Sequence, residues 1–176
     1  MIWMSVDCAL RKSGVALWNG EQLVSAFTLR PMGTKGQWAR WKEGVKVYAV
    51  PSRWSAWKLA CGCSDALVLA TERGPMRNAD RALGRATGYL EALADYRRMA
   101  FADVELSTWR RAITEEMEAR GTPITWPAGE SKTVAIAAAR ALYHQLGAAV
   151  TDDEAEAVLI GRAAMRLRLV DVGEVA

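Results

Sequence analysis

The chain has 176 residues, of which 51% are hydrophobic, so it can bury a substantial core, and we expect a single domain over residues 1–176. No run of about 18 uncharged apolar residues occurs, so no membrane span is expected. The net charge of +3 is uneven, because residues 1–60 hold nine Lys and Arg against three Asp and Glu, and the remainder holds fourteen against seventeen. A basic portion beside acidic clusters suits a protein that binds a polyanion, although a solvated surface of mixed charge has the same composition.

The predicted elements in chain order are strands over 2–10, 13–20 and 21–29, helices over 38–50 and 52–66, a strand over 66–72, a helix over 76–99, a strand over 102–108, and helices over 109–120, 131–146 and 152–170. The Asn19-Gly20 dipeptide between the second and third strands is typical of a hairpin. We therefore expect the first three strands to be consecutive and antiparallel.

The few cysteines and the single histidine limit the kinds of metal site that the chain can form. The three cysteines, Cys8, Cys61 and Cys63, form no CxxC pair, and His144 is the only histidine. This argues against a disulfide framework, a structural zinc site and a Ser-His triad, so a bound metal should be a hard, oxygen-ligated cation. The first residues lack the basic and cleavable parts of a signal peptide, and we expect a protein of the reducing cytoplasm.

Carboxylates stand at the ends of three predicted elements. Asp7 lies near the end of the first strand, and Glu72 ends the strand over 66–72. The segment "TDDEAEAVLIG" opens the last helix with four acids, Asp152, Asp153, Glu154 and Glu156. In a mixed sheet the ends of central strands lie side by side, and a final helix packed on the sheet can bring its first turns over them.

Helix capping explains only part of the last cluster. Thr151 and Glu154 match a capping box, and acids near a helix N-terminus stabilise it by about 0.3–1 kcal/mol each. Glu156 lies one turn further in and is not explained in this way. Asp153 and Glu156 are spaced i,i+3, whereas Asp152 and Glu156 are spaced i,i+4, so either pair shares a helix face and the spacing does not choose between them.

Four segments, in this order, resemble the RuvC-type Holliday junction resolvases of the ribonuclease H-like superfamily: "SVDCALRKSGVAL", "ALVLATE" followed by "NADRALGRATGYLEAL", "AGESKTVAIAAARAL" and "TDDEAEAVLIGRAA". The resemblance implies a ribonuclease H-like α/β fold. That fold has a mixed five-stranded sheet, with strands 1–3 antiparallel, flanked by helices.

The resemblance also implies a site and an activity. It makes Asp7, Glu72, Asp153 and Glu156 the catalytic metal ligands, and it places Lys132 near the scissile phosphate. The expected activity is two-metal hydrolysis of phosphodiesters with Mg²⁺, or Mn²⁺ in its place, by a homodimer that makes paired nicks in branched DNA, a four-way junction. Glu156 stands where the family more often has Asp, and no aromatic residue occurs in 73–76, where the family has a wedge residue.

Basic residues indicate how DNA would be bound. Arg77, Arg81 and Arg85 are spaced i, i+4, i+8 and form one stripe on the helix predicted over 76–99. Such a stripe suits contacts with DNA phosphates, although a solvated helix face has the same pattern. Lys132, in the first turn of its helix, opposes the helix dipole, which suggests a nearby anion.

Other functions fit parts of this pattern. An RNA/DNA-hybrid nuclease or a flap nuclease would use the same fold and acids, and a nucleic-acid-binding module could keep the fold without binding metal. A sugar-kinase or actin-like ATPase also begins with an Asp-turn-Gly hairpin, but such chains normally need two domains. We adopt the interpretation of a magnesium-dependent, structure-selective endodeoxyribonuclease of the crossover junction type.

Overall fold

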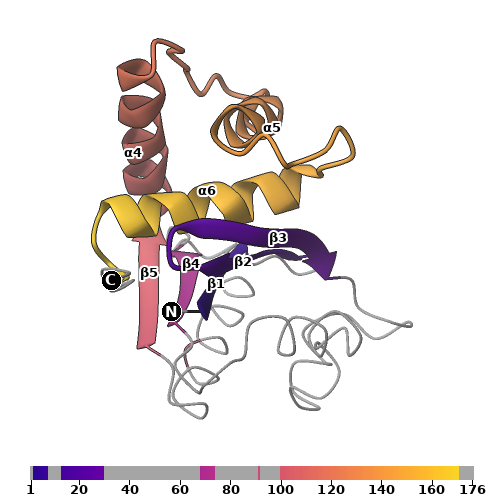
Figure 1. Ribbon diagram of the computed structural model, residues 1–176. Coiled ribbons are helices and arrows are strands. Elements are labelled where there is room, and N and C mark those ends of the chain that lie inside the picture. The colour runs from indigo at the N-terminus through magenta and orange to yellow at the C-terminus, as the bar shows by residue number, and fades with distance from the viewer. Residues whose placement is uncertain (1, 8–12, 30–67, 74–90, 92–99, 171–176) are drawn as a thin grey trace.

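In the computed structural model the described residues are 2–7, 13–29, 68–73, 91 and 100–170 (Figure 1). The strands are β1 (Ile2–Asp7), β2 (Ser13–Asn19), β3 (Gln22–Leu29), β4 (Val68–Arg73) and β5 (Ala100–Glu105). They are followed by the helices α4 (Leu106–Ala119), α5 (Ser131–Leu142) and α6 (Asp152–Arg166).

The strands form one mixed sheet in the order β3-β2-β1-β4-β5. β1 pairs antiparallel with β2, and β2 pairs antiparallel with β3, whereas β1–β4 and β4–β5 are parallel pairs. A two-residue loop can join antiparallel strands, but parallel neighbours need a longer crossover, which agrees with the long segments before β4 and β5. The predicted mixed five-stranded sheet with strands 1–3 antiparallel is confirmed.

The first hairpin turns at Gly20. Asn19 pairs with Gln22 across a two-residue loop, and Gly20, its first residue, has a φ of 56°. A type II′ turn favours glycine at this position because φ is positive there. The Trp3 indole N–H donates a hydrogen bond of 2.8 Å to the carbonyl of Gly20, which ties the turn to the start of β1. The hairpin was therefore predicted correctly, although its loop begins at Gly20 and not at Asn19.

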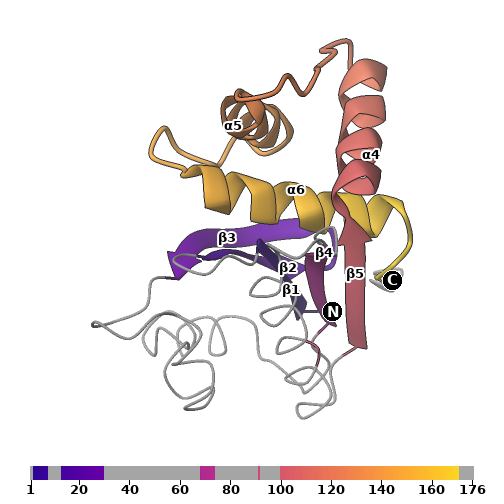
Figure 2. The same cartoon turned by 180° about the vertical axis from the view of Figure 1, so that it is seen from behind.

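Helix α6 covers one face of the sheet and contacts all of its strands (Figures 1 and 2). The close approach depends on Gly161, because a Cβ at this position would lie 2.5 Å from Ser5 Oγ and 2.6 Å from Trp18 Nε1. The Ser5 hydroxyl donates to the carbonyl of Ala157 at 2.6 Å and accepts from the Trp18 indole at 2.8 Å. These bonds satisfy the buried polar groups between helix and sheet.

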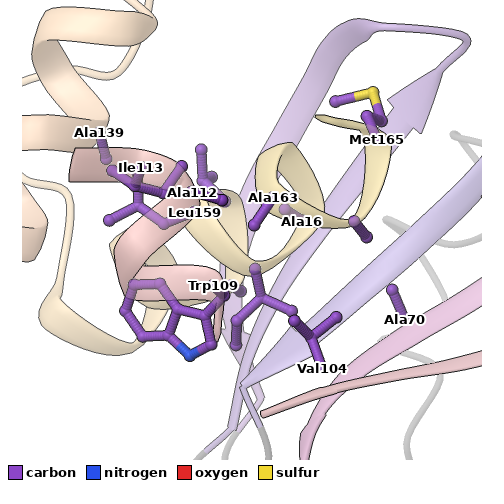
Figure 3. Close-up of a cluster of buried hydrophobic side chains, with 14 of the residues drawn as sticks. Ala16, Ala70, Val104, Trp109, Ala112, Ile113, Ala139, Leu159, Ala163 and Met165 are labelled. Carbon is purple, nitrogen blue, oxygen red and sulfur yellow. The ribbon is translucent and has the colours of Figure 1, made fainter. Parts of the chain in front are cut away.

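The remaining helices lie beyond α6. In both views α5 lies on the side of α6 away from the sheet, and α4 continues from the end of β5 (Figures 1 and 2). Figure 3 shows Trp109 and Ile113 of α4 beside Leu159 of α6, with Val104 of β5 below them. All four side chains are buried, so this core fixes α4 against α6 and the sheet.

Several predicted boundaries are wrong. The strand predicted over 102–108 ends at Glu105, and α4 begins at Leu106 instead of 109. Helix α5 ends at Leu142 instead of 146, because Tyr143 leaves helical geometry. Helix α6 ends at Arg166 instead of 170, because Arg168 has a φ of 54° and a Schellman motif closes the helix. The usual signal for such an ending is glycine, and this sequence has arginine there.

The helices predicted over 38–50, 52–66 and 76–99 lie outside the described residues, except for Glu91, which is helical and exposed. The stripe of Arg77, Arg81 and Arg85 and the three cysteines lie outside them as well. Within the part of the chain that the structure describes, no helix is both long enough and apolar enough to cross a membrane.

Candidate active site

Two of the predicted acids lie on neighbouring parallel strands. Asp7 is the last residue of β1, and Glu72 is the next-to-last residue of β4. Val6 pairs with Thr71, so Asp7 and Glu72 follow at the same level. Neighbouring strands lie about 4.8 Å apart, and residues at the same level of a parallel pair point to the same face. The two carboxylates therefore lie side by side on one face of the sheet.

The first turn of α6 lies against β2 next to Asp7. Gly14, the partner of Asp7 in the antiparallel pair, leaves no room for a side chain: a Cβ there would lie 1.8 Å from the carbonyl oxygen of Asp153. Thr28 of β3 adds hydrogen bonds of 3.0 Å with Thr151 Oγ1 and with Glu154 Oε1. Helix and hairpin are joined at the level of Asp7, which sets the height of the α6 acids above the strand ends.

The four acids of α6 divide into three roles. The predicted capping box is confirmed: Thr151 Oγ1 accepts from the Glu154 amide at 3.3 Å, and Glu154 Oε2 accepts from the Thr151 amide at 3.0 Å. Asp152 forms an ion pair with Lys132. Asp153 is buried, with 5% of its surface exposed, and its charge acts on Asp7, as does the charge of Glu156.

The carboxylates influence one another strongly. The pKa of Asp7 is raised well above its ordinary value, first by burial and then by the negative charges of Glu156, Glu72 and Asp153. A hydrogen bond between Asp7 and Glu156 adds to this effect. The pKa of Glu156 is also raised, by burial and by the charge of Glu72. Four carboxylates from three elements far apart in the sequence are thus brought together.

Glu72 has two neighbours that the sequence did not identify. Burial raises its pKa, whereas a hydrogen bond from Trp109 and the charge of Arg110 act in the opposite direction. The Trp109 indole N–H donates to Glu72 Oε2 at 2.8 Å. The "WRR" motif (109–111) gave no signal of this contact, because the predicted helix began too late to place Trp109 one turn inside it.

Lys132 lies at the edge of this cluster. Its side chain is 65% exposed at the start of α5 and pairs with Asp152, while its charge partly offsets the rise in the pKa of Glu156 that burial and Glu72 cause. Its predicted role at a phosphate stays a prediction.

The donor set suits a hard divalent cation. The converging side chains are all carboxylates, the donors that Mg²⁺ and Mn²⁺ prefer, and their mutual repulsion is the kind that such a cation relieves. Within the described residues, however, no three Asp, Glu, His or Cys side chains are drawn together into a ready-made coordination shell. The acids fit the expected metal by chemistry and by position on the sheet.

The sheet order, the acids at the strand ends and the covering helix define a class of fold. The chain has a ribonuclease H-like fold, the fold of RuvC, as predicted from the four segments. No protein-family model matches the sequence, and no curated protein matches it.

The chain is similar to solved structures at low sequence identity. Thermus thermophilus RuvC in complex with a Holliday junction substrate is similar at a TM-score of 0.61 and 15% identity over 96% of each chain. A second Thermus thermophilus RuvC structure has a TM-score of 0.57 and 14% identity, over 96% of this chain and 97% of that one. The fowlpox virus Holliday junction resolvase has a TM-score of 0.42 and 12% identity, over 97% of this chain and 100% of that one.

Proposed function

We propose that the protein is a divalent-metal-dependent endonuclease that cuts branched DNA, with a four-way junction as its preferred substrate. One observation supports this most directly: carboxylates from β1, β4 and α6 gather at one end of the sheet, on the fold of a resolvase that was solved with a Holliday junction. Each acid alone has a structural explanation. Their convergence has none, because like charges buried together destabilise a fold unless a cation or a proton joins them.

Asp7, Glu72, Asp153 and Glu156 would hold the metal. Asp7 is the central ligand in this proposal, since the charges of the other three all act on it. A pair of divalent cations would supply activation of water and stabilisation of the leaving oxygen of the phosphodiester. The chain's own contribution is to hold the four carboxylates on a rigid strand pair and a helix, in a partly buried position where electrostatic interactions are strong.

Two cations of the protein flank the acids. Lys132 is exposed and paired with Asp152, so a phosphate oxygen can replace that carboxylate as its partner. The charge of Arg110 acts on Glu72 and Glu156 and partly offsets the rise in their pKa values that burial causes. We propose that both bind the phosphate to be cut and reduce its repulsion by the acidic cluster.

A cleavage assay tests the proposal. The protein is incubated with a four-way junction, a flap, a linear duplex and an RNA/DNA hybrid, each with Mg²⁺, Mn²⁺ or EDTA. We expect metal-dependent nicks in opposed strands of the junction, and an Asp7→Asn variant that binds the junction but does not cut it. Faster cutting of the flap or the hybrid would favour those substrates, and a gel shift without any cleavage would indicate a binding module.

Paired nicks in opposed strands require two active sites. We therefore propose a homodimer, and the molar mass in light scattering, with and without junction DNA, tests it.

A further inference from the structure

Two tryptophans stand beside the acidic cluster. Trp109 of α4 is fully buried and donates its indole N–H to Glu72 Oε2. Trp126, in the loop between α4 and α5, packs its ring edge-to-face against Trp109, with 5.3 Å between the ring centroids and 85° between the planes. We call this pair the tryptophan clamp.

The clamp is tied to the start of α4. The Trp126 indole donates to Thr114 Oγ1 at 3.0 Å, and the Thr114 hydroxyl donates to the carbonyl of Arg110 at 2.9 Å. Trp126 is thereby fixed to the turn of α4 that directly follows Trp109. Edge-to-face aromatic pairs are worth about 0.5–1.5 kcal/mol beyond the area they bury, so the loop holds the Trp109 ring in one orientation.

The same rings hold a positive charge near Glu72. The guanidinium carbon of Arg110 lies 5.4 Å from the Trp109 ring centroid and 5.0 Å from the Trp126 ring centroid. Both distances are within the range of cation–π attraction. The clamp therefore fixes a hydrogen-bond donor and a cation beside the same carboxylate.

The indole bond limits how Glu72 can turn. An indole has one donor and no acceptor, and a buried donor needs a partner, so the bond is kept in the folded protein. A carboxylate offers about four lone-pair sites, so one indole bond orients Glu72 and leaves capacity for a cation. Side chains that hold metal ligands through such a bond typically change metal affinity by 10–100-fold when they are replaced.

We propose that Trp109 is a positioning residue that orients Glu72 toward a divalent cation, and that Trp126 keeps it in place. The inference rests on the proposed function, because it takes Glu72 to be a metal ligand.

The test compares two tryptophan variants by metal-dependent thermal stability. Trp109→Phe keeps a buried ring and removes only the N–H. We expect the Mg²⁺ concentration at half of the maximal rise in Tm to increase about 10–100-fold, with unchanged junction affinity in EDTA. Trp3→Phe is the matched control, because Trp3 is fully buried and its indole also donates at 2.8 Å, at the far end of β1. It should leave the Mg²⁺ midpoint within about twofold of wild type.

A double-mutant comparison separates positioning from packing. In a Glu72→Gln background, Trp109→Phe should cause no further change in the Mg²⁺ midpoint. If Trp109→Phe does not fold, Trp126→Phe replaces it, and a smaller increase of the midpoint is expected. Equal midpoints for Trp109→Phe and Trp3→Phe would overturn the inference alone. A wild-type protein whose Tm does not respond to Mg²⁺ or Mn²⁺ would overturn the proposed metal site, and the inference with it.

Discussion

Asp7 is the carboxylate on which the negative charges of the other three acids all act. Its pKa is raised by burial and by Glu156, Glu72 and Asp153, so without a cation its ionised form destabilises the folded state. A raised carboxyl pKa in the folded state means that the cost is absent below the unfolded pKa, about 4, grows as the pH rises from there to the folded pKa, and is fully present above it. The repulsion among the acids should therefore appear as a pH-dependent loss of stability in the metal-free protein.

Asp7→Asn should stabilise the protein in EDTA. The difference in Tm between variant and wild type should be small near pH 4 and increase toward pH 8, because asparagine has no charge to place among the other acids. Each unit by which the pKa is raised corresponds to about 1.4 kcal/mol, or about 3–6 °C in a chain of this length. Thermal unfolding at a series of pH values measures this. A Tm difference independent of pH would contradict the charge argument.

Glu116 is an acid with the opposite environment. Burial alone would raise its pKa, but hydrogen bonds and charges from Arg162 and Arg120 outweigh burial and lower it. Arg162 reaches both carboxylate oxygens at 2.8–3.2 Å, and its own pKa is raised in return. Nearby Tyr143, mainly because it is buried, has its pKa raised to about 12. This cluster joins α4 to α6 and serves the fold.

Glu116→Gln should destabilise the fold by about 3 kcal/mol, the lower end for a broken buried pair, because Arg162 keeps 19% exposure. A fall in Tm of about 6–12 °C is expected, since a carboxylate with a lowered pKa stabilises the folded state at neutral pH. Glu115→Gln, at the exposed neighbouring position, is the control and should change stability by less than about 0.5 kcal/mol. Similar Tm values for both variants would show that the cluster contributes little.

At the scale of elements, the contact between β2 and α6 sets the geometry of the site. Gly14 lies against the backbone of Asp153 and pairs with Asp7, so one glycine fixes how far the helix acids stand from the strand acid. The glycine was noticed in the sequence as part of the first hairpin. Its contact with α6 joins residues 139 positions apart and is visible only in the folded chain.

Gly14→Ala should displace the first turn of α6. The new Cβ would lie 1.8 Å from the Asp153 carbonyl oxygen and 2.9 Å from the Glu154 amide nitrogen, so backbone must move. We expect the free energy of unfolding to fall by about 1–3 kcal/mol or more. The Mg²⁺ concentration at half of the maximal rise in Tm should clearly increase. Gly147→Ala, where a Cβ has no neighbour within 4 Å among the described residues, is the control. An unchanged Mg²⁺ midpoint in Gly14→Ala would show that α6 does not set the site.

At the scale of the whole molecule, the proposed site connects β1, β4 and α6. A ligand that binds only the folded state stabilises all of it, by about 2.7 kcal/mol at one hundred times its dissociation constant. Mg²⁺ and Mn²⁺ should therefore raise the Tm by about 5–11 °C at such concentrations. Calorimetry with and without metal measures the shift, and Asp7→Asn should lose most of it. An equal shift in the variant would place the bound metal elsewhere.

The sequence alone determined the strands, the hairpin, the capping box and the acids at element ends. Each of these depends on signals within a few residues. Examples are the Asn19-Gly20 dipeptide of the hairpin and the spacing of Thr151 and Glu154 in the capping box. The resemblance to the resolvases depended on the order of such segments, and the fold that it implied is confirmed.

Only the tertiary structure decided which acids of α6 face the sheet, since Asp152 and Asp153 have equivalent spacings and differ only in what packs against them. Trp109 and Arg110 were missed for the same reason, because the start of α4 is set by packing against Glu72 and the α6 core and no local cap marks it. Local signals fix where elements form. Contacts between residues far apart in the chain fix which side chains meet, and these contacts exist only after the elements have packed.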